Sequence, residues 1–414
     1  MRYFKVVFVL FIIGCSTVEK VEKTGNYQAV IDRYAGSIKK NDAEVNYSVA
    51  EAFRKSNRIQ EGLPFYQMAM KKGVPDPYSY LHYAHALKAN QQYAKAKGIL
   101  EIGLNKVGSA KVKEQIEKEL SSIKKFESMS LDDSYFRIKS ISNLNSSYSE
   151  YSPVYRQGYL YFVSNRDGGK VYKTTGTPFT DIYRVRGDFK SVSLGEIQKL
   201  DPTINLDHVN NGTASLSADG RAMVFARANS GNPNGYSNVN LFYTRFRNGA
   251  WTNPRPIAIC DPEAWDSTPF LSPDGNTLYF SSNRAGGYGE SDLYVAKLNR
   301  RGRWVDVRNL GSQINTAGQD QFPFISDDGT LYFASDGHPG FGKLDIFKSV
   351  RVAGEINIEN LGKPINSSGD DFGYFEYDAT HGFFSSDRKE GKGGDDLYAF
   401  INDDPNLKIV NYFY

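Results

Sequence analysis

The feature that most constrains the fold is a motif that recurs five times after residue 150. Its clearest copy, residues 269–284, has a Ser-Pro-Asp-Gly turn followed by Leu-Tyr-Phe-Ser-Ser, and Asp292-Leu293-Tyr294 follows after a glycine-rich stretch. Asp-Gly pairs tolerate the positive φ of tight hairpin turns, and the Leu-Tyr-Phe run is typical of a buried strand. Each copy therefore predicts adjacent antiparallel strands of one sheet, which suits a chain with 14 % aromatic residues and 38 glycines.

The spacing of the copies indicates how the sheets are arranged. The anchoring phenylalanines of the five copies are Phe162, Phe225, Phe280, Phe333 and Phe384. Intervals of 51 to 63 residues leave room for about four strands per copy, which is the size of a propeller blade. Residues 303–307 and 355–358 have the pattern of outer strands. Tyr135–Lys139 precedes the first copy, so we predict that it completes the last blade and closes a five-bladed ring; six blades are the alternative.

The region before the propeller has a second, shorter period. A pattern of small and large apolar residues recurs after 34 positions: Ala50, Phe53, Ile59, Gly62, Tyr66 and Ala69 are followed by Ala84, Leu87, Tyr93, Ala96, Leu100 and Gly103. Small residues allow two helices to approach closely, and the large residues fill the space between helical turns. The predicted fold class is therefore α+β multidomain, with a short α-helical solenoid followed by an all-β propeller.

Both repeats resemble known families. The 34-residue pattern resembles the tetratricopeptide repeat, and the strand motif resembles the WD40-like β-propeller repeat of TolB and related periplasmic proteins. The predicted domains are a lipoprotein signal peptide (1–14), a lipidated tether (15–24), a tetratricopeptide-like helical domain (25–128) and a TolB-type propeller (134–414).

The first residues predict that the protein is exported to the cell envelope. Arg2 and Lys5 precede the apolar run Val6–Ile13, which is too short to span a membrane as a helix and is typical of a secretory signal. The sequence Ile12-Ile13-Gly14-Cys15 resembles the bacterial lipobox. That resemblance implies that Cys15 carries the acyl chains, palmitate among them, and Ser16 after it implies the outer membrane. An ordinary signal peptide with an incidental cysteine is the alternative.

The order of these segments resembles a narrower group, the OmpA-family outer-membrane lipoproteins of the PorE type, which are linked to type IX secretion. The resemblance implies a non-enzymatic, periplasm-facing scaffold whose partners are envelope or secretion-system proteins. Proteins of that group continue into a peptidoglycan-binding domain, and this sequence ends after the propeller, so no direct peptidoglycan binding is expected. The net charge of +3 is too small to favour nucleic acid as a partner.

The tetratricopeptide resemblance also implies a partner groove on the first helix of each repeat. The implied partner-binding residues are Tyr47, Glu51, Arg54, Leu81, His85 and Lys88. Tyrosine and arginine are common interface anchors, and Arg54 and Lys88 are expected to meet acidic groups of a partner. A slightly basic, solvated helix face is the alternative. Residues 16–130 are indeed basic as a whole, and the propeller region is acidic.

The remaining motifs favour structure over catalysis. Arg284 with Asp292, and their counterparts Arg388 and Asp396, are predicted to be structural ion pairs or turn caps, because an active site rarely follows repeat symmetry. The glycine-rich stretches 286–289 and 391–394 are interpreted as blade loops, with a calcium site as the alternative. Cys260 is expected to be a small buried residue.

No catalytic residue, metal or cofactor is predicted. His82 and His85 share a helix face, but no acidic third ligand for zinc is obvious in the sequence. No nucleophile elbow or zinc-protease motif is present. The alternatives to a scaffold are a surface-exposed glycan- or nutrient-binding lipoprotein and a metal-dependent propeller lyase.

Overall fold

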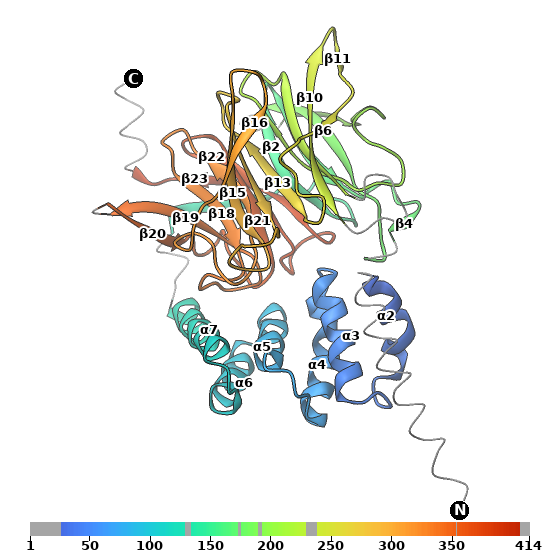
Figure 1. The fold of residues 1–414 in the computed structure, drawn as a ribbon, viewed down its shortest axis with the longest axis vertical. Helices are drawn as coiled ribbons and strands as arrows, with labels where there is room; N and C mark the ends of the chain where they lie inside the picture. The colour runs from blue at the N-terminus through green and yellow to red at the C-terminus, as the bar shows by residue number, and fades with distance from the viewer. Residues whose placement is uncertain are drawn as a thin grey trace, which may run out of the picture. The chain divides into compact units, whose positions relative to one another are not determined.

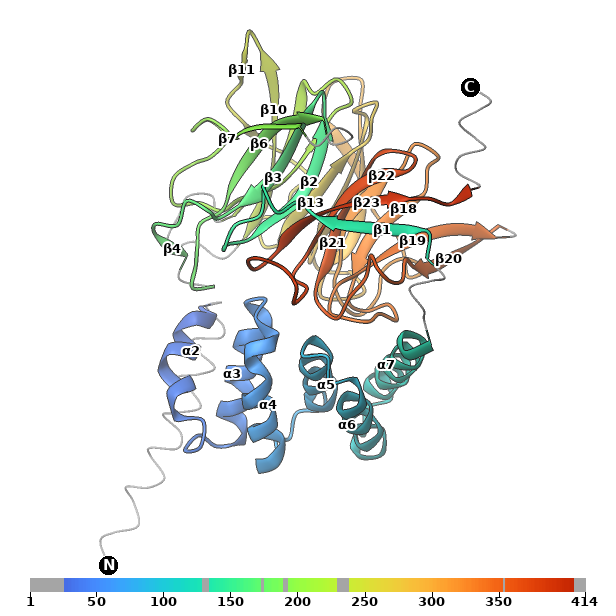
Figure 2. The same ribbon diagram turned by 180° about the vertical axis from the view of Figure 1, so that it is seen from behind.

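The computed structural model describes residues 26–128, 134–172, 175–188, 193–228, 238–352 and 354–405 (Figures 1 and 2). The chain divides into two compact units, Met1–Lys124 with Val171–Thr177 and Lys125–Lys170 with Pro178–Tyr414. The predicted signal peptide and tether, with Cys15, lie outside the described residues. Among the helices that are described, none is both long enough and apolar enough to cross a bilayer.

The N-terminal unit is helical, as predicted. Its elements are α2 (Tyr27–Tyr34), the 3-10 turn η1 (Ala35–Ser37), α3 (Ala43–Lys55), α4 (Ile59–Lys72), α5 (Ser79–Ala89), α6 (Tyr93–Lys106) and α7 (Ala110–Ser128). Two helix starts are capped by side chains: Asn26 accepts from the Ala29 amide and Asp42 from the Val45 amide. Gly73 ends α4 in the left-handed conformation that favours glycine.

Small residues let these helices approach closely, as the repeat pattern predicts. A Cβ atom on Gly62 would lie 3.2 Å from the Ala50 carbonyl oxygen, and one on Gly103 would lie 2.7 Å from the Cβ of Tyr80. Ala50, Ala84 and Ala96 are fully buried in the same apolar core. The small residues of the 34-residue pattern therefore do lie where helices pack closely. The assignment of these helices to the tetratricopeptide family stays a prediction.

The second unit is a five-bladed β-propeller, which confirms the predicted number of blades. Blade 1 contains β2 (Glu150–Arg156), β3 (Tyr159–Ser164), β6 (Asp181–Asp188) and β7 (Ser193–Lys199). Blade 2 contains β8 (Asn211–Leu216), β9 (Ala222–Ala228), β10 (Val239–Arg247), β11 (Ala250–Trp251) and β12 (Arg255–Pro256). Blade 3 contains β13 (Asp266–Leu271), β14 (Thr277–Ser282), β15 (Asp292–Leu298) and β16 (Trp304–Asn309).

Blades 4 and 5 complete the ring. Blade 4 contains β17 (Asp320–Ile325), β18 (Leu331–Ser335), β19 (Asp345–Val352) and β20 (Glu355–Asn360). Blade 5 contains β21 (Asp371–Asp378), β22 (His381–Ser386), β23 (Asp396–Asn402) and, as its outer strand, β1 (Phe136–Ser140). A separate two-stranded pair consists of β4 (Val171–Tyr172) and β5 (Thr177–Pro178).

The ring closes where the sequence predicts. Strand β1 pairs antiparallel with β23, in a register that runs from Phe136 opposite Asn402 to Ser140 opposite Tyr398 (Figure 2). The first strand of the propeller therefore completes its last blade. The five anchoring phenylalanines are all buried in the apolar clusters of the sheets, with at most 1 % of each residue exposed.

Candidate functional site

Most of the predicted groove residues meet in one polar network inside the helical unit. Its first centre is the carboxylate of Glu51 on α3, which is buried. The Tyr66 hydroxyl donates to Glu51 Oε1 at 2.6 Å, and the Arg54 Nε donates to Oε2 at 3.0 Å. The His82 Nδ1 lies 2.9 Å from Oε1 and 3.0 Å from the Tyr47 hydroxyl. Three helices, α3, α4 and α5, thus converge on one carboxylate.

A second centre is the carboxylate of Glu119 on α7. The Lys88 Nζ lies 2.6 Å from Glu119 Oε2, and the His85 Nε2 lies 3.3 Å from Oε1. Lys88 is only 1 % exposed, so its ammonium group and the Glu119 carboxylate compensate each other in a site with little access to water. The rings of His82 and His85, one turn apart on α5, are 6.4 Å apart and lie one at each centre.

The electrostatics of both centres favour ionised carboxylates. Burial on its own would raise the pKa of Glu51, but the charges of His82 and Arg54 outweigh burial and hold that pKa well below its ordinary value. Burial also acts to raise the pKa of Glu119, and Lys88 with His85 lowers it to about 2. The network is therefore a set of paired charges that ties α3, α4, α5 and α7 together.

These contacts change the interpretation of the predicted groove. Glu51, Leu81 and Lys88 are buried, Leu81 within the apolar core, whereas Tyr47, Arg54 and His85 are half-buried. Arg54 and Lys88, expected to meet acidic groups of a partner, instead pair with Glu51 and Glu119 of the same unit. Tyr66, His82 and Glu119 complete the network, and sequence reasoning did not include them in the groove. Only the half-buried side chains reach a surface.

The zinc alternative receives no support here. His82 and His85 each face a different carboxylate and do not converge on a common point. Across the described residues, no group of three or more His, Cys, Asp or Glu side chains could hold a metal ion.

The propeller contains a repeated clamp between an acid and an arginine. Each first strand begins with a fully buried polar residue: Glu150, Asn211, Asp266, Asp320 or Asp371. In blade 3 the Arg284 Nη2 lies 2.7 Å from Asp266 Oδ1, and in blade 5 Arg388 pairs with Asp371 at the same distance. Each of these guanidinium groups also lies over the anchoring phenylalanine of its blade.

The clamp shows which acids pair with the two arginines that were predicted to have a structural role. Arg284 and Arg388 do form structural ion pairs, but with Asp266 and Asp371 on the first strand and not with Asp292 and Asp396. Blades 1 and 2 have the same arrangement: Arg166 pairs with Glu150 at 3.1 Å, and Arg227 donates to the Asn211 amide oxygen at 3.0 Å.

Asp292 and Asp396 are turn caps for the glycine-rich loops. The Asp292 carboxylate accepts from the amides of Tyr288 and Gly289 at 2.6 and 3.1 Å, and Asp396 accepts from the Lys392 amide. A Cβ atom on Gly287 or Gly391 would collide with the carboxylate that its loop surrounds. The glycines are thus required because the loop folds tightly around the protein's own aspartate, which accounts for them without calcium.

A third repeated contact joins each blade to the one before it. The Asn315 side chain accepts from the Leu293 amide and donates to the Leu293 carbonyl at 2.8 and 3.1 Å, and Asn145, Asn205 and Asn366 do the same in their blades. At the remaining junction the Leu241 amide donates to the Cys260 sulfur at 3.2 Å. Cys260, expected to be a small buried residue, is half-buried and occupies the asparagine position of the repeat.

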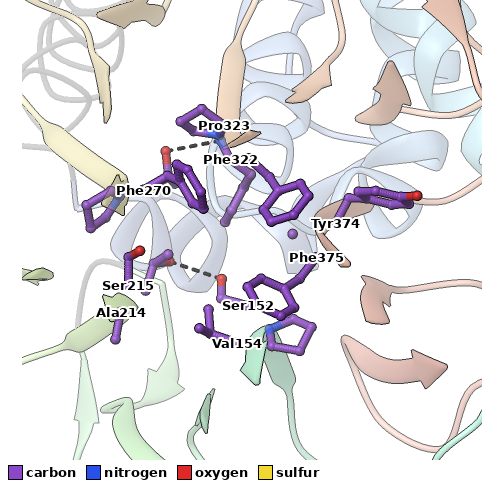
Figure 3. A pocket seen from close by; sticks show the side chains of 15 residues that line it. Ser152, Val154, Ala214, Ser215, Phe270, Phe322, Pro323, Tyr374 and Phe375 are labelled. Atoms are coloured by element: carbon purple, nitrogen blue, oxygen red, sulfur yellow. Dashed lines mark hydrogen bonds between the residues drawn. The ribbon is translucent and has the colours of Figure 1, made fainter. Parts of the chain in front are cut away.

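The axis of the propeller contains a small apolar cavity of about 30 Å³ (Figure 3). It is lined by the first strands of all five blades, including Val154, Ala214, Phe270, Phe324 and Phe375. Its polar groups form hydrogen bonds to one another: the hydroxyls of Ser152 and Thr213 are 3.0 Å apart, and the Thr268 hydroxyl accepts from the Phe322 amide at 3.1 Å. This volume holds one or two water molecules and is too small for a substrate.

Backbone bulges shape this cavity. In each first strand the pairing shifts at the residues that face the axis, for example between Gln321 and Phe324 in blade 4. Ser152, Thr268 and Phe322 have positive φ at these bulges. The bulges turn the strands at the axis, and their polar groups form hydrogen bonds with neighbouring first strands.

Comparisons with known proteins give a likeness of fold only. No protein-family model and no curated protein matches the chain. Among solved structures, a TolB protein from Agrobacterium tumefaciens is 16 % identical, with a TM-score of 0.38 over 64 % of this chain and 90 % of that chain. A thermostable family-43 glycoside hydrolase is 12 % identical, with a TM-score of 0.38 over 62 % of this chain and 91 % of that chain.

A third neighbour, the Bacteroides ovatus xyloglucan-locus protein GH43B, is 14 % identical, with a TM-score of 0.39 over 64 % of this chain and 54 % of that chain. These neighbours include a TolB protein and glycoside hydrolases, and likeness at this level carries no argument about activity. The propeller assignment rests on the strand pairing given above.

Proposed function

We propose that this protein is a non-enzymatic scaffold of the bacterial envelope, anchored in the outer membrane through Cys15 and facing the periplasm. Its partners are proteins of an envelope machine, with type IX secretion or outer-membrane protein assembly as the first candidates. The helical unit, as a tetratricopeptide-like module, supplies the partner surface. The sequence resemblance supports the location and the machine.

One observation carries the scaffold role. Many charged groups inside the two units pair with one another or cap turns: Glu51 and Glu119 pair with cations in the helical unit, and arginine clamps and aspartate-capped loops recur in several blades of the propeller. Charged groups that pair inside a unit make that unit a rigid body. Catalysis would instead require an acid, base or nucleophile that faces an open site. Surfaces are what such a body offers to other molecules.

The partner surface is tested by capture from the native envelope. Tyr47 is half-buried, so Tyr47→Ala changes the exposed edge of the network without removing a charge. We expect the tagged variant to lose envelope proteins that the parent protein captures after cross-linking. Tyr135→Ala, which removes an exposed ring just before β1, is the matched control and retains them. Equal capture by both variants, with unchanged helix content, would contradict a partner surface on the helical unit.

The anchor is tested separately. Cys15→Ser removes the only lipid attachment point that the lipobox resemblance implies, so we expect the variant to leave the membrane fraction or to keep its signal peptide. Unchanged membrane partitioning and mobility on a gel would count against lipidation.

A specific observation also favours the glycan-binding alternative. Tyr148, Trp265 and Tyr288 are 38 %, 46 % and 51 % exposed. Tyr148 and Trp265 precede first strands, and Tyr288 lies between the second and third strands of blade 3, so antiparallel pairing places all three at the same end of the blades. Aromatic rings exposed in this way can stack on the C–H faces of sugars.

Tryptophan fluorescence distinguishes this alternative. A glycan that stacks on Trp265 changes the emission of the parent protein in a saturable titration, and Trp265→Phe removes most of that change. A panel of envelope and plant-type oligosaccharides that leaves the emission unchanged would exclude this surface as a glycan site.

A further inference from the structure

One blade departs from the clamp that the others share. In blade 4 the position of the arginine is occupied by Gly337, and the ring of His338 fills the place of the guanidinium group. That ring lies 5.6 Å from the ring of Phe333 and 5.3 Å from that of Phe347, as the arginines lie over their own aromatic residues. Its Nε2 is 2.7 Å from the Ile314 carbonyl oxygen, as the Arg388 Nη2 is from the Ile365 carbonyl oxygen.

His338 replaces the stacking and the carbonyl contact of the arginine, but the acid of the clamp keeps no cation. Asp320, at the start of β17, is 0 % exposed. Its Oδ2 accepts from the Thr316 amide at 2.6 Å and from the Thr316 hydroxyl at 2.9 Å. Its Oδ1 is buried without a hydrogen-bond partner among the residues that the structure describes. A carbonyl oxygen can only accept, so the His338 Nε2 carries a proton and donates it to Ile314.

The groups that face Asp320 are neutral or negative. Across the sheet, Ser335 on β18 lies opposite Asp320, and Asp345 on β19 lies opposite Ser335. Asp292 at the start of β15 in blade 3 acts on Asp320 with a repulsive charge. Within the described ranges, no lysine or arginine forms an ion pair with Asp320. An ionised Asp320 is therefore a buried charge with hydrogen-bond donors but no lysine or arginine to pair with it, which proteins avoid.

Asp320 also lies at a junction between blades. Its backbone amide donates to the Ser291 carbonyl of blade 3 at 2.8 Å, and Ser291 forms an isolated parallel bridge with Gln319. The carboxyl group is thus one residue from the contacts that hold β17 to the neighbouring blade. A change in the charge of the carboxyl group therefore acts directly on the contacts between blades 3 and 4.

We propose that the junction between blades 3 and 4 is a proton-dependent joint, closed while Asp320 is protonated and loosened when Asp320 is ionised. The inference goes beyond the scaffold role and does not depend on it. The joint would let one face of an otherwise rigid propeller respond to the pH of its compartment. The midpoint falls in a useful range, because burial raises the pKa of Asp320 to about 7.

The test is hydrogen–deuterium exchange of the full chain at pH 5.5 and pH 8.5, corrected for the intrinsic pH dependence of exchange. Peptides that cover β17 and β18 report the joint, and peptides that cover β13 and β14 in blade 3, where Arg284 balances the acid, are the internal reference. We expect protection of β17 and β18 to fall about tenfold or more at the higher pH, with a much smaller change in the reference.

Asp320→Asn is the decisive variant, because Asn211 already occupies this position in blade 2. It keeps the shape and removes the charge, so the protection of β17 is expected to change with pH no more than the protection of the reference peptides. Asp306→Asn, an exposed change on β16, is the matched control and is expected to keep the pH dependence. Persistence of the fall in Asp320→Asn would overturn the proposal. So would equal protection of β17 at both pH values in the parent protein, a comparison that needs no variant.

Discussion

The helical unit and the propeller both bury carboxylates, and they differ in how completely a cation balances them: the propeller pairs Glu150, Asp266 and Asp371 with arginines but leaves Asp320 without one. In the helical unit, Glu51 has two nitrogen partners, Arg54 on its own helix and His82 on α5, and Glu119 has Lys88 and His85, both on α5. In the propeller, Asp320 is buried and Glu376 is half-buried, both among neutral or acidic groups, and Asp395 lies near Asp370 and Asp387, with the cation Lys343 beside these three acids. The two units therefore differ in where the balancing charge comes from.

This difference gives the units opposite pH responses. The pKa of Glu119 is lowered to about 2, so its contribution to stability is present above the unfolded pKa of about 4.5 and is lost as the pH falls. Burial raises the pKa values of Asp320, Glu376 and Asp395 to about 7. Their folded states favour the proton, so stability is highest below the unfolded pKa values and is lost as the pH rises toward 7. The helical unit is thus suited to neutral pH, and the propeller is more tolerant of acid.

The largest expected effect comes from breaking a balanced pair. Lys88→Met leaves the Glu119 carboxylate buried with only His85 beside it, and we expect a loss of about 3–5 kcal/mol in the stability of the helical unit. Circular dichroism at 222 nm reports the helices, and fluorescence of Trp251, Trp265 and Trp304 reports the propeller, which holds all three tryptophans. Lys95→Met, on the exposed side of α6, is the control. An unchanged helix midpoint in Lys88→Met would contradict the importance of the pair.

A second change converts one blade to the chemistry of another. Arg284→Met removes the cation from the buried Asp266 and gives blade 3 the imbalance of blade 4, at an expected cost of about 2–4 kcal/mol at neutral pH. The tryptophan signal is expected to lose stability with rising pH more steeply than in the parent protein. Adding Asp266→Asn is expected to restore most of the loss. A double variant as unstable as the single one would show that packing of the arginine, and not its charge, matters.

The pH responses themselves are the third prediction. Between pH 5 and pH 8.5 we expect the stability reported by tryptophan to fall by about 2–3 kcal/mol for each carboxyl group whose pKa is raised to about 7, with the signal at 222 nm falling less. Below pH 4.5 the order reverses, and the helices unfold first. Parallel loss of both signals across the whole range would remove the distinction between the units.

The smallest expected effect concerns the glycine loops. Gly287→Ala places a Cβ atom against the Asp292 carboxylate, so we expect a loss of about 1–2 kcal/mol in propeller stability. Gly108→Ala in the helical region, where no atom lies within 4 Å of the added Cβ, is expected to change little. Calcium is not expected to restore the variant; a calcium-dependent rise in the parent's melting temperature would instead favour the ion site.

The fold of the propeller could be predicted from the sequence because the same motif of turn and buried strand occurs five times. Asp-Gly turns, buried phenylalanines and the isolated strand at 135–139 together predict the blades and the closure. The sequence predicted ion pairs or turn caps for Arg284 and Asp292, and the structure has one of each, but the acid that pairs with Arg284 was not predicted. Asp266, the real partner, is brought beside it only by the antiparallel register of β13 and β14.

The polar network of the helical unit was predicted only in part. Helical periodicity places Tyr47, Glu51 and Arg54 on one face of α3, but it does not say what covers that face. The contact between Lys88 and Glu119 joins residues 31 positions apart through the packing of α5 against α7. A single sequence contains no local signal for that pairing, so Lys88 was interpreted as exposed. Burial depends on the neighbouring helix, and this is the level at which the prediction failed.

The pairing of β1 with β23 has a consequence for how the protein is made and pulled. β1 is the first strand of the propeller in chain order and β23 the last, so β1 cannot take its place in the fifth blade until the whole propeller segment is available for folding. Once formed, the same strand pair lies between the chain entering the ring and the rest of the sheet. A pulling force applied through residues 134–136 would act first on the five residue pairs between β1 and β23. We therefore expect β1 to separate from the fifth blade before any other strand of the propeller does.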